Sequence, residues 1–121
     1  MKRIALVLLA LFVLAPARAQ QDPELARQFL RCSFYLVNYG KLVTDPRQLE
    51  SVKAKVTLFS AVGAVKASST KFVEDELVPA GSYVAAELQQ LPQADLEPFL
   101  RQRDQECTAL LREHRQAYFA R

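Results

Sequence analysis

Two cysteines and a single histidine are the residues of this chain best suited to metal chemistry. Cys107 and His114 lie seven residues apart, on one face of a helix, and Cys32 could approach them to form an incomplete Cys-Cys-His zinc site. No fourth ligand can be named, and charged residues flank the histidine on both sides. A Cys-x-x-Cys-His haem attachment motif is absent. We therefore expect a solvated or interfacial histidine and neither a metal nor a cofactor.

The same two cysteines are better explained as a disulfide. An even number of cysteines is typical of structural bridges in a small chain that begins, as residues 1–19 do here, with the pattern of a secretory signal. Redox pairs usually have the close Cys-x-x-Cys spacing, which is missing here. The sequence therefore predicts a bridge between Cys32 and Cys107. This bridge would enclose most of the residues of the domain in one covalent ring.

Catalytic groups are not recognisable in the sequence. The chain lacks a phosphate-binding Gly-rich loop and a nucleophile-elbow motif around a serine. Its one dense group of carboxylates is Glu74, Asp75 and Glu76, and consecutive helical residues point in different directions, so they cannot converge on one reacting atom. A solvated acidic helix end is the first interpretation, and a docking patch for a basic partner is the alternative. We expect no enzymatic activity.

Clustered aromatic residues are the strongest indication of a binding surface. Phe34, Tyr35 and Tyr39 follow one another so closely on a predicted helix that they cannot all face one core, and Tyr118 with Phe119 spans two faces. Exposed aromatic rings are favoured at binding surfaces, although such rings can also line a small apolar cavity. Arginines make the C-terminal region locally cationic. The candidate binding residues are Phe34, Tyr35, Tyr39, Arg112, Arg115 and Tyr118.

The elements that must position these residues are helices. Asp22-Pro23 and Asp45-Pro46 are helix starts, in which the aspartate caps the helix and the proline takes the first position, where its missing N–H costs nothing. The first helix carries one apolar stripe with Cys32 in its middle, and Gly40 fits its end. The stripe consists of Leu25, Phe29, Cys32, Leu36 and Tyr39.

The second helix should run from Pro46 for at least twenty residues. Small side chains fill the stretch 60–69, which favours tight helix packing over a ligand groove. Whether residues 46–78 form one helix or two is left open. Pro79-Ala80-Gly81-Ser82 is the strongest interior helix breaker, so we expect a turn or kink there, followed by a shorter helix that stops before Pro92.

Four helical segments with short connections predict a small all-α, up-and-down helical bundle, clamped by one disulfide between the first and last helices. A bridge that joins the terminal helices agrees with an even number of helices. A three-helix version, in which the second helix runs on to Leu77, is the alternative.

The first 19 residues have the three parts of a secretory signal peptide. A basic start precedes an apolar run from Ile4 to Ala15, and a small-x-small cleavage site follows at residues 17–19. We expect cleavage after Ala19, which leaves residues 20–121 as a single helical domain in the periplasm or outside the cell. The apolar run is shorter than the roughly 20 residues that span a bilayer, so stable membrane insertion is not expected.

Charge limits the function further. The whole chain has 16 basic and 13 acidic residues, but Lys2, Arg3 and Arg18 leave with the signal peptide. The remaining domain is formally neutral, which gives no electrostatic reason to expect nucleic acid or an anionic membrane as a partner.

Export, a disulfide clamp, surplus aromatic residues and the lack of a catalytic set together favour an interaction protein. We expect a non-enzymatic helical bundle that binds another protein in the cell envelope. The alternative is a carrier or sensor that holds a small apolar ligand or lipid between the helices. The sequence leaves the identity of the partner and the oligomeric state open.

Overall fold

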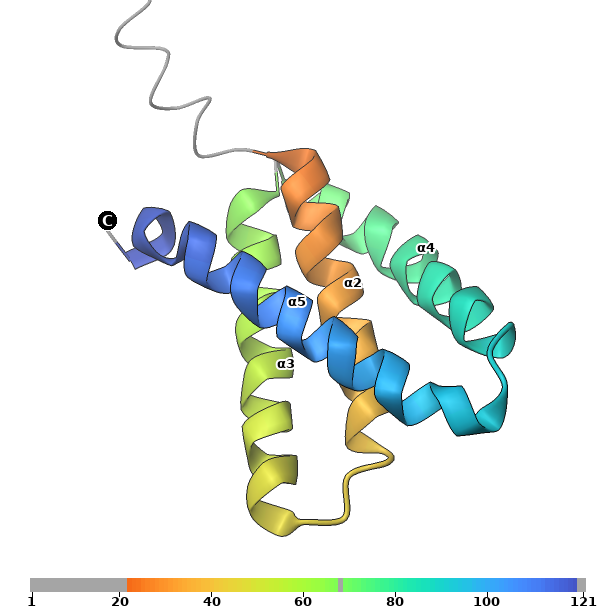
Figure 1. Ribbon diagram of the computed structural model, residues 1–121. Helices are drawn as coiled ribbons and strands as arrows, with labels where there is room; N and C mark the ends of the chain where they lie inside the picture. The colour runs from red at the N-terminus through yellow and green to blue at the C-terminus, as the bar shows by residue number, and fades with distance from the viewer. Residues whose placement is uncertain (1–21, 68, 120–121) are drawn as a thin grey trace, which may run out of the picture.

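The computed structural model describes residues 22–67 and 69–119, with the backbone alone for residues 115–119. Their regular elements are α2 (Pro23–Gly40), α3 (Pro46–Lys66), α4 (Thr70–Gln89) and α5 (Gln93–Phe119). Successive helices run in opposite directions (Figure 1). The prediction of an all-α bundle of four helices is confirmed. The signal peptide predicted over residues 1–19 lies outside the described part of the chain.

Side-chain caps fix where three of these helices begin. Asp22 and Asp45 each accept a hydrogen bond from a backbone N–H in the first turn of their helix, at 3.1 Å and 3.0 Å, as the Asp-Pro pairs predict. Ser69 caps α4 in the same way and accepts from the N–H of Phe72 at 3.0 Å. This third cap separates α3 from α4, so residues 46–78 belong to two helices.

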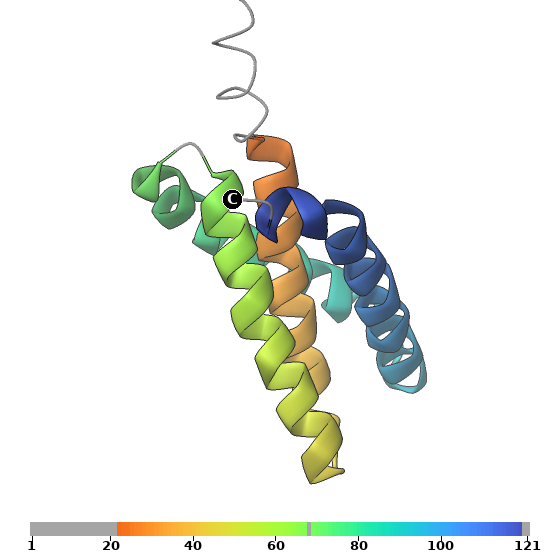
Figure 2. The same cartoon turned by 90° about the vertical axis from the view of Figure 1, so that its left-hand side faces the viewer.

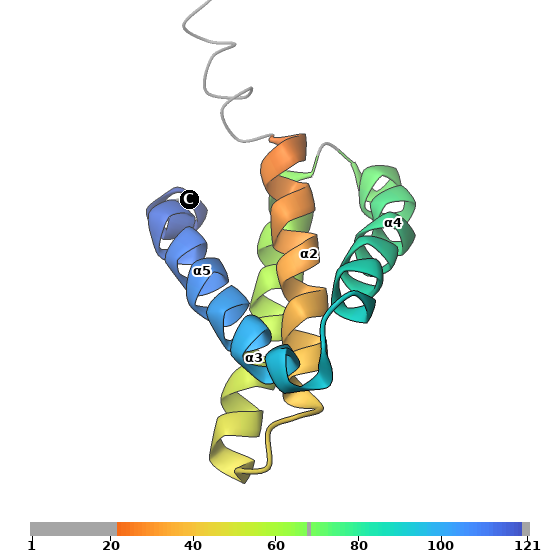
Figure 3. The ribbon, with the colours of Figure 1, turned by 45° about the vertical axis from the view of Figure 1, so that its right-hand side comes forward.

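Helix α2 is the centre of the fold because it packs against all three other helices. α3 runs antiparallel beside it (Figure 2), whereas α4 and α5 diverge on either side of it (Figure 3). The ring centroid of Phe29 on α2 lies 6.1 Å from that of Phe59 on α3 and 6.3 Å from that of His114 on α5. The largest fully buried side chains are Phe29, Phe59, Leu30, Leu36, Leu100, Val62 and Val84.

Small residues let α2 and α3 approach closely. The hydroxyls of Ser33 and Ser60 lie 3.0 Å apart across the helix pair. One turn further along α3, a Cβ added at Gly63 would lie 3.3 Å from Cδ2 of Leu30 and 3.5 Å from the carbonyl oxygen of Ala26. These residues of the stretch 60–69 therefore serve helix packing, the interpretation that the sequence favoured.

Gly63→Val should lower the free energy of unfolding by about 1–3 kcal/mol, the usual cost of overpacking a helix interface. The branched side chain must push Leu30 aside or separate the two helices, because even a Cβ is a tight fit. Urea denaturation measures the loss. Ala64→Val, on the exposed side of the same helix, is the matched control and should change stability by about 0.5 kcal/mol at most. Equal losses in the two variants would contradict the packing argument.

The turn predicted at residues 79–82, with a new helix after it, is wrong. α4 is a single helix from Thr70 to Gln89, with Pro79 inside it. Proline removes the donor for the carbonyl of Asp75, but both residues are exposed, so water can satisfy that carbonyl. Gly81 serves close packing instead of a turn, because an added Cβ would lie 3.2 Å from the ring of Phe34.

The disulfide between Cys32 and Cys107 is confirmed. It joins α2 to α5, the first and last described helices, with a Cα–Cα distance of 5.8 Å. Both cysteines are buried in the core. The bridge therefore fixes α5 against the central helix at a point where the two helices already pack together.

Candidate functional site

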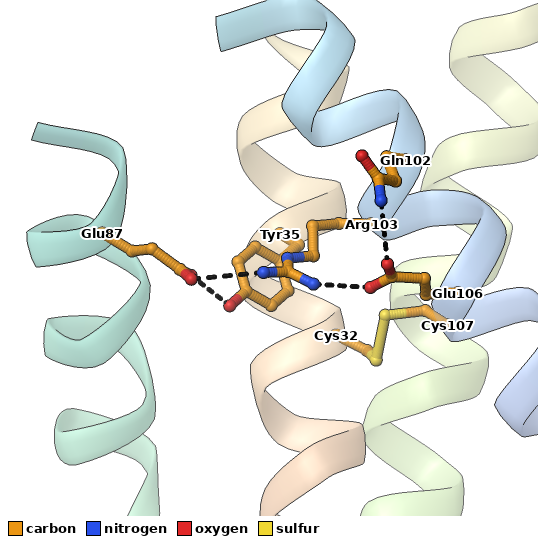
Figure 4. Close-up of polar contacts among 7 residues, drawn as sticks. All are labelled: Cys32, Tyr35, Glu87, Gln102, Arg103, Glu106 and Cys107. Atoms are coloured by element: carbon orange, nitrogen blue, oxygen red, sulfur yellow. Dashed lines mark hydrogen bonds and ion pairs between the residues drawn. A yellow bond between two sulfur atoms is a disulfide. The ribbon is translucent and has the colours of Figure 1, made fainter. Parts of the chain in front are cut away.

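A polar cluster beside the disulfide connects three helices (Figure 4). The hydroxyl of Tyr35 on α2 donates a hydrogen bond to the carboxylate of Glu87 on α4. Arg103 on α5 pairs with Glu87 at 3.3 Å and with Glu106 at 2.5 Å. Gln102 donates to the other oxygen of Glu106 at 3.2 Å. Arg103 is thus shared by two carboxylates from two helices and holds the C-terminal turn of α4 beside α5.

The cluster offers hydrogen bonds between helices and no activated nucleophile. Burial and the hydrogen bond to Glu87 raise the pKa of the Tyr35 phenol above its ordinary value, so the phenol is protonated at neutral pH. The guanidinium of Arg103 lies 4.7 Å from the ring centroid of Phe99, a cation–π contact. Both cysteines are joined in the disulfide. The groups of this cluster therefore position α4 and α5 on α2.

Stability should fall as the pH rises above about 10, the ordinary pKa of tyrosine. Because folding raises the pKa of Tyr35, the unfolded chain loses its phenolic proton first, and deprotonation then favours unfolding. Tyr35→Phe should remove up to about 1.4 kcal/mol of this loss per pH unit. Urea denaturation at several alkaline pH values measures the slope. The control is Tyr83→Phe, which alters an exposed tyrosine; equal slopes in both variants would refute a special environment at Tyr35.

The predicted binding residues do not form one surface. Tyr35 and Tyr39 are only 7% and 4% exposed, and the hydroxyl of Tyr39 accepts a hydrogen bond from Gln48 at 3.2 Å. Both are therefore core residues with satisfied hydroxyls, and in this structure their rings offer little surface to a partner. Phe34 is half-buried and Arg112 is exposed. The side chains of the other two candidates, Arg115 and Tyr118, lie outside the described residues.

A different apolar surface lies along α4, on the flank that borders Phe34 of α2. Val78 is 75% exposed and Leu77 is 41% exposed. With Phe34 and Gly81 they line a shallow hollow of about 430 Å³, which also includes Ser82 and Ala85. We call these six residues the apolar α4 surface. Solvent-exposed apolar residues that gather in one patch mark interaction sites more often than isolated ones do.

The three acidic residues Glu74, Asp75 and Glu76 of α4 border this surface. One of them pairs with α2, and the other two are exposed. Glu76 pairs with Arg27 of α2 at 3.3 Å. The guanidinium of Arg27 also lies 5.3 Å from the ring centroid of Phe72. Glu74 and Asp75 are exposed. Glu76 therefore binds α4 to α2, while its two neighbours place negative charge beside Leu77 and Val78.

A second apolar hollow, of about 550 Å³, lies between the end of α2 and the first half of α3. Its floor is formed by core residues such as Leu36 and Val52, which are 0% and 4% exposed. Val37, at 42% exposed, stands on its α2 side. We call this hollow the α2–α3 groove.

Comparison with known proteins adds no further constraint on these sites. No protein family, curated protein or solved structure matches the chain. In the described part of the chain, no three His, Cys, Asp or Glu residues are grouped as metal ligands would be. Among the described helices, none combines the length and the apolar composition that crossing a membrane requires.

Sequence reasoning missed the apolar α4 surface because it ended a helix at Pro79. In one continuous helix, Ala80 and Val84 are four residues apart and share the buried face. Val78 lies two residues before Ala80 and so falls on the opposite side. A helical projection drawn through the proline would have placed Val78 in solvent. The partner of Tyr35 carries no comparable local signal, because Glu87 is 52 residues away.

Proposed function

We propose that this chain is an exported, non-enzymatic protein of the cell envelope, periplasmic or secreted, that binds another protein through the apolar α4 surface. The observation that carries the proposal is the 75% exposure of Val78 next to Leu77 at 41%. Both lie on a helix that packs mainly on α2, and both side chains are exposed to solvent. Covering this patch would remove apolar surface from water, the main favourable term in protein association.

The charges around the surface indicate the chemistry of the partner. Glu74 and Asp75 are exposed at its edge, and a partner with an apolar centre and basic residues at its rim would complement both features. Rim charges of this kind mainly speed association and select partners. The proposal thus includes the alternative function considered for Glu74, Asp75 and Glu76, a docking site for a basic partner.

Site-specific photo-crosslinking in the host envelope tests the proposal. A photoreactive amino acid at position 78 should give one dominant crosslinked protein, and the mature material should begin at Gln20 if the signal peptide is removed as expected. With the photoreactive amino acid placed instead at Ser82 of the same surface, Val78→Asp should reduce crosslinking of that protein by more than about tenfold, because a buried unpaired carboxylate costs several kcal/mol. The circular dichroism melting curve should stay unchanged, because the side chain is in solvent.

Ala86 supplies the matched control, since it is an exposed residue of the same helix outside the apolar α4 surface. A photoreactive amino acid at position 86 should not give the adduct seen at position 78. Ala86→Asp should leave the crosslink from position 78 unchanged. The same adducts at positions 78 and 86, or none at 78, would reject the proposal. Tyr35→Ala and Tyr39→Ala cannot serve here, because both side chains are buried and their loss would impair folding.

A further inference from the structure

The α2–α3 groove has the character of a ligand site. Its floor is made of apolar side chains from two helices, Leu36 on α2 and Leu49, Val52 and Val56 on α3. Its volume of about 550 Å³ lies within the range of sites for small molecules, which are mostly apolar with a few charged or polar groups. It shares no residue with the apolar α4 surface, so an argument about the groove does not depend on the proposed function.

The charged residues that line the groove have one sign. Lys41 stands on its α2 side and Lys53 on its α3 side, and the lining includes no acidic residue. Both lysines are exposed, and neither is among the described ion pairs, which use Lys55, Arg27, Arg101 and Arg103. Lysine side chains lay their aliphatic stems along apolar surface and keep the ammonium in water. An anionic group at the rim would therefore meet two ammonium groups, while the apolar part of the same molecule covers the floor.

We propose that the α2–α3 groove binds a free single-chain anionic amphiphile of the fatty-acid type. The acyl chain lies on the apolar floor, and the carboxylate lies at the rim by Lys41 and Lys53. The groove runs along α3 from Leu49 to Val56, which is two turns or about 10 Å. This short length fits one acyl chain of moderate length.

Isothermal titration calorimetry of the full mature protein with hexanoate, octanoate and decanoate tests the apolar part of the proposal. Burial of a methylene contributes about 0.8 kcal/mol, so affinity should rise by up to about fourfold for each methylene added. Gly40→Leu should weaken decanoate binding. A Cβ there makes ordinary contacts at 3.5 Å with Leu49 and Val52, so the leucine can fill the groove without strain. Affinity that is independent of chain length, or unchanged by Gly40→Leu, would overturn the proposal.

Decyltrimethylammonium, with the same chain and the opposite charge, tests the role of the lysines. The wild-type protein should prefer decanoate, and Lys41→Glu with Lys53→Glu should reverse that preference, at up to about fivefold per lysine. Lys71→Glu, at an exposed position on α4, is the control and should leave the preference unchanged. Equal affinity for the two amphiphiles would overturn the proposal. The proposal would also be overturned if the protein bound anionic vesicles or a helical peptide but did not bind decanoate in the groove.

Discussion

Replacing Cys32 and Cys107 together with serine should lower the free energy of unfolding by about 4 kcal/mol, within the 2–5 kcal/mol usual for a small exported domain. The two cysteines are 75 residues apart, so the bridge restricts most of the unfolded chain. It also joins α5 to the one helix on which α5 mainly packs. For a domain of this size, each kcal/mol corresponds to a shift in Tm of about 4–8 °C.

Urea denaturation of three samples measures this effect: the oxidised protein, the reduced protein and the double serine variant. Reduction should lower the stability of the wild type to that of the variant, and reductant should not affect the variant. Oxidised and reduced protein that unfold at the same urea concentration would show that the bridge adds nothing to stability.

Phe29→Ala should cost about 3–5 kcal/mol, the usual loss for a fully buried phenylalanine. Phe29 is 0% exposed, and its ring contacts Phe59 of α3 and His114 of α5. Alanine would leave a cavity where three helices meet, and neither neighbour can fill it without separating from α2. The loss includes the transfer free energy of the ring and the cost of the cavity.

The matched control for Phe29→Ala is Tyr83→Ala on α4. Tyr83 is 48% exposed, and its ring lies 3.9 Å from the guanidinium carbon of Arg31. Truncation there should cost about 1 kcal/mol at most, the range of an exposed cation–π contact. Both variants are compared by urea denaturation at neutral pH. Similar losses at the two positions would mean that the centre of the core does not lie at Phe29.

Local signals in the sequence were sufficient for α2 and α3. The Asp-Pro pairs predicted both starts, and the apolar stripe of α2 became the centre of the core. The disulfide followed from arithmetic, since two cysteines allow one pairing. The helix starts and the apolar stripe depend on residues within a few positions of one another, and the disulfide depends on the number of cysteines. None of these predictions requires knowledge of how the helices pack.

Features that depend on packing between helices were not accessible in the same way. Pro79 and Gly81 disfavour a helix locally, yet α4 continues through both because its inner residues Ala80 and Val84 are buried. Tyr35 was expected at the surface because Phe34, Tyr35 and Tyr39 lie too close together on the helix to face one core, yet its phenol is buried with a partner. Glu87 supplies that partner from a distant helix. The exposed residues of α4 likewise depend on which helices α4 packs against, so the sequence did not indicate this candidate site.

The position of α4 within the covalent ring affects how the protein can open. α4 packs mainly on α2, and the disulfide encloses it together with α3. A local opening in which α4 leaves α2 keeps both of its ends tethered, through α3 at residue 66 and α5 at residue 93. Its return is then an intramolecular event at high effective concentration. If α4 detached, it would therefore return readily, while α2 would keep its contacts with α3 and α5 and its covalent link to α5.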